Sequence, residues 1–293
     1  MRTTDFLQPE SWAEALDAKA AHPESVPIAG GTDLMVELNF DHRRPETVLD
    51  LTRVPELTEW GTEDGMVRVG AGVPYSRIIA ELGDRLPGLA IASRTVGSPQ
   101  IRNRGTVGGN LGTSSPAGDA LPPLYAVDAE VELASREGSR RLPVTEFVSG
   151  PKRNRLDPGE LIAAFWMPVA EGPEQYAKIG TRNAMVIAVC SFGLALRPER
   201  RRVGACIGSA GPTPIRARDA EDFIAGVLEE DGLWDSRGAI PERAVGRFGE
   251  IVAQAARPIS DVRGTADYRR HAVGVLARRT LGWAWADYAG GPS

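Results

Sequence analysis

The sequence predicts a mixed α+β protein with about two domains, and three observations support this prediction. The chain has 293 residues, which is long enough for about two domains and a sizeable core. In its first part, short apolar segments typical of strands alternate with segments of helical periodicity. Beyond residue 173, three consecutive strand-like segments precede a helical remainder, and this order indicates an antiparallel sheet packed against helices.

The order of elements in the first part follows from apolar patterns and caps. Residues 1–24 predict a short strand followed by a helix, for which Ser11 and Glu14 form a capping-box pattern. Further strands and helices alternate after it. The expected strands are 26–30, 47–51 and 66–73, and the expected helices are 33–39 and 75–82.

A segment of different character follows. Residues 89–118 are rich in glycine, serine, asparagine and proline and show little periodicity, so we expect a long structured loop there. A strand, a tight turn and a second strand are expected over 129–147, and another strand over 160–168. The proline-flanked acidic segment 168–174 is the predicted domain boundary.

The last part predicts a three-stranded antiparallel sheet and helices. The strand-like segments are 174–180, 186–196 and 201–211, and a connection of hairpin length, RPER, joins the second to the third. Apolar residues between Ala217 and Leu228 then follow helical spacing. Residues 235–260 are weakly helical, and 268–288 form the expected final helix.

The composition excludes several classes of function. Hydrophobic residues make up 42% and charged residues 25% of the chain, as in ordinary globular proteins. The formal net charge of −5 offers no basic surface for nucleic acid and no polybasic patch for a membrane. No apolar run approaches the roughly 18 residues of a membrane span, and the N-terminus lacks an apolar signal-peptide core. We therefore expect no nucleic-acid partner and no membrane span.

The cysteines and histidines predict no metal site. Cys190 and Cys206 lie in apolar segments, and two cysteines are too few for an iron–sulfur cluster, which usually takes four thiolates. His22, His42 and His271 are scattered without the spacing of metal ligands. We expect the cysteines to be buried, inert strand residues of a reduced, cytoplasmic protein.

Two glycine-rich segments are candidates for ligand binding. In IAGGTDL (28–34), two glycines stand between an expected strand and an expected helix, where backbone amides suit a phosphate group. The alternative is a plain strand-to-helix turn with Thr32 or Asp33 as N-cap. The segment contains neither the GxxxxGK[ST] nor the GxGxxG pattern, so standard nucleotide-binding interpretations are poorly supported.

The second segment, 105–119, holds five glycines, four hydroxyl side chains, an amide and a carboxylate. A core strand cannot use such residues, and two Gly-Gly loops in one domain can jointly bind a diphosphate. Asn110 can both donate and accept hydrogen bonds. Asp119 can accept hydrogen bonds from sugar hydroxyls, or it can cap the helix that begins ALPPLYAV.

These two segments together resemble the FAD-binding medium subunit of the molybdenum hydroxylases, the family of xanthine dehydrogenase and carbon monoxide dehydrogenase. The likeness runs through LDPGELIAAFWMP, YAKIGTRNAMVIAVCSFGLAL, PTPIRARDAE and YRRHAVGVLARR, and covers essentially the whole chain. It implies a two-subdomain FAD-binding module of the PCMH/vanillyl-alcohol-oxidase type over 1–172, with subdomains of about 1–60 and 61–172. A C-terminal domain of the molybdenum-hydroxylase flavoprotein type would follow over 173–293.

The resemblance also implies a set of cofactor-binding residues. The first loop would wrap the FAD diphosphate, the second would complete its site, Asp119 would bind the sugar portion, and four residues would lie near the isoalloxazine ring or its approach. Lys178 has a physical rationale there, because a cation near the flavin would stabilise its anionic reduced form; the alternative is a solvated lysine. The roles of Arg102, Arg104 and Arg182 are left open. The loop residues are Ala29, Gly30, Gly31, Thr32, Asp33, Leu34, Thr106, Gly109, Asn110 and Thr113, and those near the ring are Val96, Ile101, Ile162 and Lys178.

The function that the resemblance implies is electron transfer within a heterotrimer. A small subunit would carry [2Fe–2S] clusters, a large subunit would carry molybdopterin, and FAD in this chain would pass electrons to NAD⁺ or another acceptor. No side chain is then expected to be catalytic. The alternative is a free-standing FAD-dependent oxidase, but that calls for a longer C-terminal domain with a histidine or tyrosine at the flavin, and His271 is the only histidine after residue 173. Substrate, acceptor and oligomeric state are left open.

Overall fold

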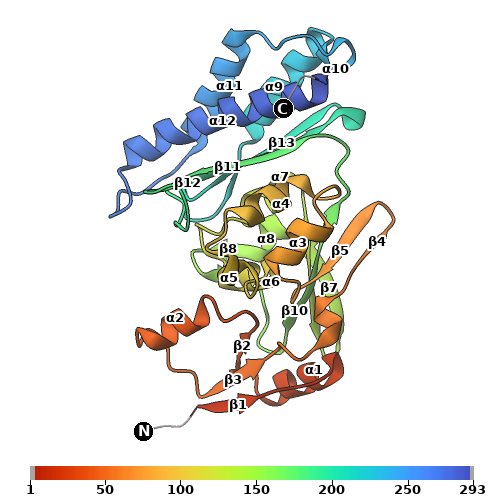
Figure 1. The fold of residues 1–293 in the computed structure, drawn as a ribbon, viewed down its shortest axis with the longest axis vertical. Coiled ribbons are helices and arrows are strands. Elements are labelled where there is room, and N and C mark those ends of the chain that lie inside the picture. Colours follow the sequence, from red (N-terminus) through yellow and green to blue (C-terminus); the bar gives the residue numbers. More distant parts are fainter. Residues whose placement is uncertain (1–3, 291–293) are drawn as a thin grey trace.

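The computed structural model describes residues 4–290 and has two parts (Figure 1). The N-terminal region, residues 4–172, carries three sheets and several short helices, and the C-terminal region, residues 173–290, carries one sheet and four helices. The predicted boundary at 168–174 falls between strands β10 (Leu161–Pro168) and β11 (Glu174–Ile179). The division into domains stays a prediction, and its outer ends, 1–3 and 291–293, lie outside the described residues.

The chain begins with a small parallel sheet. Its order is β1-β3-β2, and helix α1 connects β1 to β2. The predicted cap is confirmed, because the Ser11 hydroxyl accepts a hydrogen bond of 3.2 Å from the Glu14 amide. Helix α2 then leads from β2 towards β3. The bounds are β1 (Asp5–Leu7), α1 (Trp12–Ala21), β2 (Val26–Ile28), α2 (Leu34–Asn39) and β3 (Thr47–Asp50).

A five-stranded antiparallel sheet forms the body of the N-terminal region. Its order is β4-β5-β10-β6-β7. Strand β10 lies at the centre, and seven of its eight residues are buried, which explains its uninterrupted apolar sequence. Short helices α3, α7 and α8, the turn η1 and the hairpin β8-β9 complete the region. The bounds are η1 (Pro55–Thr58), β4 (Trp60–Glu63), β5 (Met66–Gly70), α3 (Tyr75–Glu81), α7 (Leu121–Ala126), β6 (Glu130–Ser135), β7 (Gly138–Pro143), α8 (Val144–Phe147), β8 (Val148–Gly150) and β9 (Arg153–Asn154).

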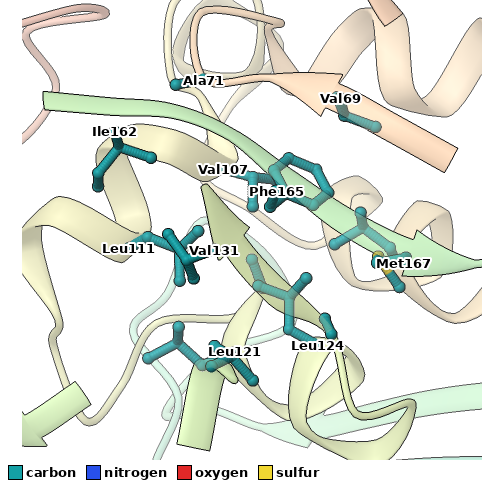
Figure 2. Packing of buried hydrophobic residues seen from close by; sticks show 14 of the residues in the cluster. Val69, Ala71, Val107, Leu111, Leu121, Leu124, Val131, Ile162, Phe165 and Met167 are labelled. Atoms are coloured by element: carbon teal, nitrogen blue, oxygen red, sulfur yellow. The ribbon is translucent and has the colours of Figure 1, made fainter. Parts of the chain in front are cut away.

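The expectation of one long loop over 89–118 is wrong. The segment contains three short helices, α4 (Pro87–Arg94), α5 (Pro99–Arg102) and α6 (Val107–Thr113). Proline stands at the first turn of α4 and α5, where its missing amide costs nothing. Packing overrides the poor helix propensity of glycine in α6, where a Cβ on Gly108 would lie 2.4 Å from the Ala71 carbonyl oxygen. Figure 2 shows the core that results, with labelled residues Val107, Leu111, Leu121, Leu124, Val131, Phe165 and Met167.

The C-terminal sheet has four antiparallel strands, not the three expected. Its order is β11-β12-β13-β14, and the additional strand β14 has only two residues, too few to show an alternating pattern in the sequence. The helices lie on the side of the sheet away from the N-terminal region (Figure 1). The bounds are β12 (Cys190–Arg197), η2 (Pro198–Arg200), β13 (Arg202–Gly208), β14 (Ile215–Arg216), α9 (Arg218–Glu230), α10 (Leu233–Ser236), α11 (Glu242–Ala255) and α12 (Ala266–Ala289).

Helix α7 joins the two regions by packing on the sheet. It lies on the face of β12 and β13 that carries small residues, and the opposite face carries the larger residues that pack on α9, α11 and α12. A Cβ on Gly204 would lie 1.9 Å from the Ala126 carbonyl oxygen, so the strand and the helix backbone are in direct contact. Cys190 and Cys206 are free and buried, as expected. Between residues 4 and 290, the structure offers no helix with the length and apolarity to cross a membrane.

Candidate functional site

Two adjoining cavities lie beside the glycine-rich segments. One has a volume of about 810 Å³ and the other of about 450 Å³, and we call them the large cavity and the small cavity. Both are lined by the loop after β2 and by the start of α6, so together they form one elongated site. The residues that line both cavities are Pro27, Ala29, Asp33, Leu34, Gly109 and Thr113.

The first glycine segment turns from β2 into α2, and its two glycines have different structural reasons. Gly31 has a φ of +74°, a conformation that favours glycine. A Cβ on Gly30 would lie 1.9 Å from the Arg104 carbonyl oxygen, so Gly30 lets the two glycine-rich segments touch. Asp33 stands at the N-cap of α2 but makes no capping hydrogen bond. Its carboxylate instead accepts a hydrogen bond of 3.0 Å from the Thr113 hydroxyl, which links the two segments across the site.

The second glycine segment contains the whole of α6. Thr106 is its N-cap, and the Thr106 hydroxyl accepts a hydrogen bond of 2.8 Å from the Gly109 amide. Gly109 and Gly112 both line the large cavity. A Cβ on Gly109 would meet only the Thr106 hydroxyl at 3.2 Å, and one on Gly112 only Ile162, at 3.7 Å. Few protein atoms therefore lie near the Cβ positions of these two glycines, and the space there is part of the large cavity.

The side chain of Asn110 has an unsatisfied hydrogen-bond acceptor beside the small cavity. Its side-chain oxygen Oδ1 is buried and accepts no hydrogen bond among the described residues, although Asn110 lines the small cavity. A buried acceptor without a donor is costly, so a ligand that supplies a donor would be favoured. Gly118 allows this placement, because a Cβ there would lie 2.6 Å from the same oxygen.

Asp119 and Lys178 form an ion pair at the wall of the small cavity. The Lys178 ammonium lies 2.6 Å from Asp119 Oδ2, and the Tyr176 hydroxyl donates to Asp119 Oδ1 at 2.8 Å. The side chain of Lys178 is only 9% exposed and that of Asp119 only 11%. Burial raises the pKa of Asp119, while the charge of Lys178 and the two hydrogen bonds act to lower it. Asp119 does not cap α7, whose N-cap is Ala120.

Two of the arginines whose roles the sequence leaves open bind backbone carbonyls. Arg102 Nη1 donates to the carbonyls of Arg94, Val96 and Gly97 at 3.0–3.1 Å. Arg182 Nε donates to the carbonyls of Ala184 and Met185, each at 3.1 Å. Both therefore order segments at the small cavity, which Val96, Gly97 and Met185 line.

The structure brings together all but one of the predicted site residues. Lys178 does not line either cavity. Ile162 lies in the large cavity, whereas Val96 and Ile101 lie only in the small one, so these residues are at opposite ends of the site. Sequence reasoning missed Tyr75 and the segment 185–187 in the small cavity, and Arg43 and Lys152 in the large one. No local pattern marks them, because the fold alone brings them to the site.

Comparison with known proteins agrees with this architecture. Residues 2–170 match the family described as "FAD binding domain in molybdopterin dehydrogenase", and residues 175–284 match "CO dehydrogenase flavoprotein C-terminal domain". The chain is 32% identical to the nicotinate dehydrogenase FAD-subunit of Eubacterium barkeri over 77% of this chain and 81% of that protein. It is 30% identical to the glyceraldehyde dehydrogenase medium chain of Sulfolobus acidocaldarius, over 94% of this chain and 96% of that one.

A solved structure shares the whole fold. It is a carbon monoxide dehydrogenase from Hydrogenophaga pseudoflava, which aligns with a TM-score of 0.85 and 26% identity and covers 97% of this chain and 98% of its own. The fold and the glycine-lined site thus define an FAD-binding chain. It belongs to the FAD-binding medium subunits of the molybdopterin hydroxylases, of the carbon monoxide dehydrogenase and xanthine dehydrogenase type, and is the FAD subunit of a multi-subunit molybdenum-containing oxidoreductase.

The residues present fit FAD. The joined cavities suit an elongated ligand, and the space at Gly109 and Gly112 lets a ligand approach the backbone closely. The buried Asn110 oxygen accepts no hydrogen bond from the described residues. FAD has hydroxyl and amino donors as well as phosphate acceptors, so it can satisfy both the amides and the acceptors of this site.

Proposed function

We propose that this chain holds FAD along the two cavities and relays electrons from the [2Fe–2S] clusters of a small partner subunit to NAD⁺ or another acceptor. The observation that carries the proposal is the pair of cavities joined at the two glycine-rich segments. FAD supplies the redox chemistry, because it can accept electrons singly and in pairs. The side chains bind and orient it, and none has to act as an acid or a base.

The geometry supports one arrangement of the cofactor. The diphosphate belongs beside the residues that line both cavities, among them Ala29, Asp33, Gly109 and Thr113. The isoalloxazine ring belongs in the small cavity, with Val96 and Ile101. Ile162 then contacts the other end of the cofactor, in the large cavity. The expectation that Ile162 lies near the ring stays a prediction, and it corresponds to the reverse orientation of the cofactor.

Partner subunits complete the proposed enzyme. Relatives with the names "FAD-subunit" and "medium chain" cover most of this chain, which supports a place beside a small iron–sulfur subunit and a large molybdopterin subunit. Their names specify nicotinate and glyceraldehyde, which supports selection of the substrate by the large subunit rather than by this fold. The cytoplasmic location expected from the two unpaired cysteines stays a prediction.

The first experiment is an absorption spectrum of the purified chain after incubation with FAD. We expect the bands of oxidised flavin in a stoichiometric complex, and release of FAD rather than FMN on denaturation. The same complex should stay oxidised with any organic substrate until the iron–sulfur and molybdopterin subunits are added. Reduction by a substrate without partners would instead support a free-standing oxidase. A chain that takes up no FAD, alone or in the complex purified from its source, would refute the proposal.

A further inference from the structure

We propose that Lys178 is a positioning residue: its ammonium fixes three segments of the small-cavity wall and presents the Asp119 carboxylate to the ligand, without contacting that ligand as a free cation. The identity of the ligand as FAD rests on the proposed function. The positioning role itself does not, since the contacts of Lys178 are made within the chain.

The ammonium group of Lys178 has no donor left over. Its three N–H bonds are matched by three acceptors, Asp119 Oδ2 at 2.6 Å, the Thr95 carbonyl at 2.9 Å and the Val186 carbonyl at 3.1 Å. The lysine comes from β11 of the C-terminal region, and the acceptors come from the end of α4, from the start of α7 and from the segment before β12. One side chain thus connects three separate parts of the site.

The carbonyls at the end of α4 show how closely this wall is specified. Those of residues 94, 96 and 97 accept from Arg102, and that of residue 95 accepts from Lys178. Two cations therefore bind four consecutive carbonyls at a helix C-terminus, where positive charge is favourable. Val96 lines the small cavity, so its position depends on these two side chains.

The electrostatics also argue against a free cation. Lys178 and Asp119 lie in direct contact, so a ligand in the small cavity faces a pair with no net charge rather than a lone ammonium. Asp119 remains able to bind a ligand, because each of its oxygens accepts one hydrogen bond from the chain and has capacity for another. Asp119 lines the small cavity, whereas Lys178 does not.

The test compares Lys178→Met and Lys178→Arg with the native chain. Amide hydrogen exchange in the FAD-free protein is the first measurement. Both variants should exchange at least about tenfold faster in segments 94–97 and 184–187. Methionine has no hydrogen-bond donor, and the planar guanidinium of arginine does not match the arrangement of the three acceptors around the Lys178 ammonium. FAD affinity should fall at least about tenfold in both, although arginine keeps the positive charge.

The reduction potential of bound FAD separates positioning from a direct charge effect. We expect Lys178→Met and Lys178→Arg to change this potential alike, because both variants lose the same contacts although only arginine keeps the positive charge. Arg68→Met is the control: it breaks the 2.9 Å ion pair between Arg68 and Glu132 within the N-terminal sheet, and neither residue lines the large or the small cavity. It should leave affinity, potential and exchange in both segments unchanged.

Three results would overturn the inference. They are native exchange in both segments of Lys178→Met, full FAD affinity in Lys178→Arg, and a fall in potential in Lys178→Met that Lys178→Arg does not show. If Lys178→Met does not fold, the arginine variant still decides between the two roles. If the native chain binds no FAD but the two variants exchange faster in both segments, the positioning role is supported and the proposed function is refuted.

Discussion

At the residue scale, glycines that look alike in the sequence serve different purposes. Gly30 and Gly108 face backbone atoms that a Cβ would overlap, so they are needed for packing. Gly109 and Gly112 have room for a side chain as far as the protein is concerned, and both line the large cavity. Only the second pair reports on the ligand, and only the structure distinguishes the two pairs.

We therefore predict that Gly109→Val weakens FAD binding at least about tenfold, because its side chain takes space that the diphosphate needs, at the cost of a small shift of the Thr106 hydroxyl. The measurement is titration of the FAD-free chain with FAD. Gly226→Val is the control, since Gly226 also lies in a helix and a Cβ there meets nothing within 4 Å. Equal affinity in the two variants would remove Gly109 from the diphosphate site.

At the element scale, β11 and α4 are matched along their length. Glu174 and Lys178 lie on the same side of the strand, four residues apart. The Glu174 carboxylate accepts a hydrogen bond of 3.0 Å from the Gly88 amide in the first turn of α4, and Lys178 donates to Thr95 at its C-terminus. Each charge thus has the sign that the helix dipole favours at that end. The C-terminal region thereby fixes a helix that leads into the small cavity.

Glu174 should make the stability of this contact depend on pH. Burial raises its pKa from the ordinary 4.5 to about 7, although the Gly88 amide and the charge of Arg197 act in the opposite direction. A raised folded-state pKa means that the folded chain binds more protons between these values, so stability falls as the pH rises from about 4.5 to about 7.

The predicted comparison is between the native chain and Glu174→Gln, which keeps an acceptor for the Gly88 amide without a charge. The variant should gain up to about 3 kcal/mol over the native chain between pH 4.5 and pH 8. Urea unfolding at several pH values measures this difference, and Glu63→Gln at an exposed position controls for the loss of one carboxylate. If the difference in unfolding free energy between the two chains does not change with pH, the pKa of Glu174 is not raised by burial and the prediction is wrong.

The same elements show what the sequence could predict. Apolar runs correctly predict β10, β12, β13 and the hairpin between the last two, because burial of both faces dictates those runs. Helices α4 to α6 escape prediction, since tertiary contacts such as Gly108 against Ala71 overcome weak propensity. The motifs identify most cavity residues, but the partners of Lys178 lie 8 to 83 positions away in the chain and carry no pattern that links them to it.

At the scale of the whole molecule, the C-terminal sheet is shared by both regions. The face of β12 and β13 towards α7 consists of small residues, Ser191, Gly193, Ala195, Gly204, Cys206 and Gly208. Polar contacts add to this interface. Arg216 donates a hydrogen bond of 2.6 Å to the Tyr125 carbonyl and also binds Asp128. A sheet that contributes to the cores on both of its sides should unfold together with both regions.

We expect calorimetry to show a single transition for the native chain and a loss of about 3 kcal/mol or more for Gly204→Val. The added side chain has to displace the Ala126 carbonyl oxygen, which lies 1.9 Å from the position of the new Cβ and belongs to a buried helix rather than a flexible side chain. In Gly204→Val, α7 should separate from the C-terminal sheet. The single transition should then split in two, because the C-terminal core and the N-terminal sheet unfold at different temperatures. Gly61→Val is the control, because Gly61 also lies in a strand and nothing approaches its Cβ position within 4 Å. Two transitions in the native chain would show that the regions are stable separately. The hydrogen bonds from Glu174 and Lys178 of β11 to α4 would then not couple the unfolding of the two regions.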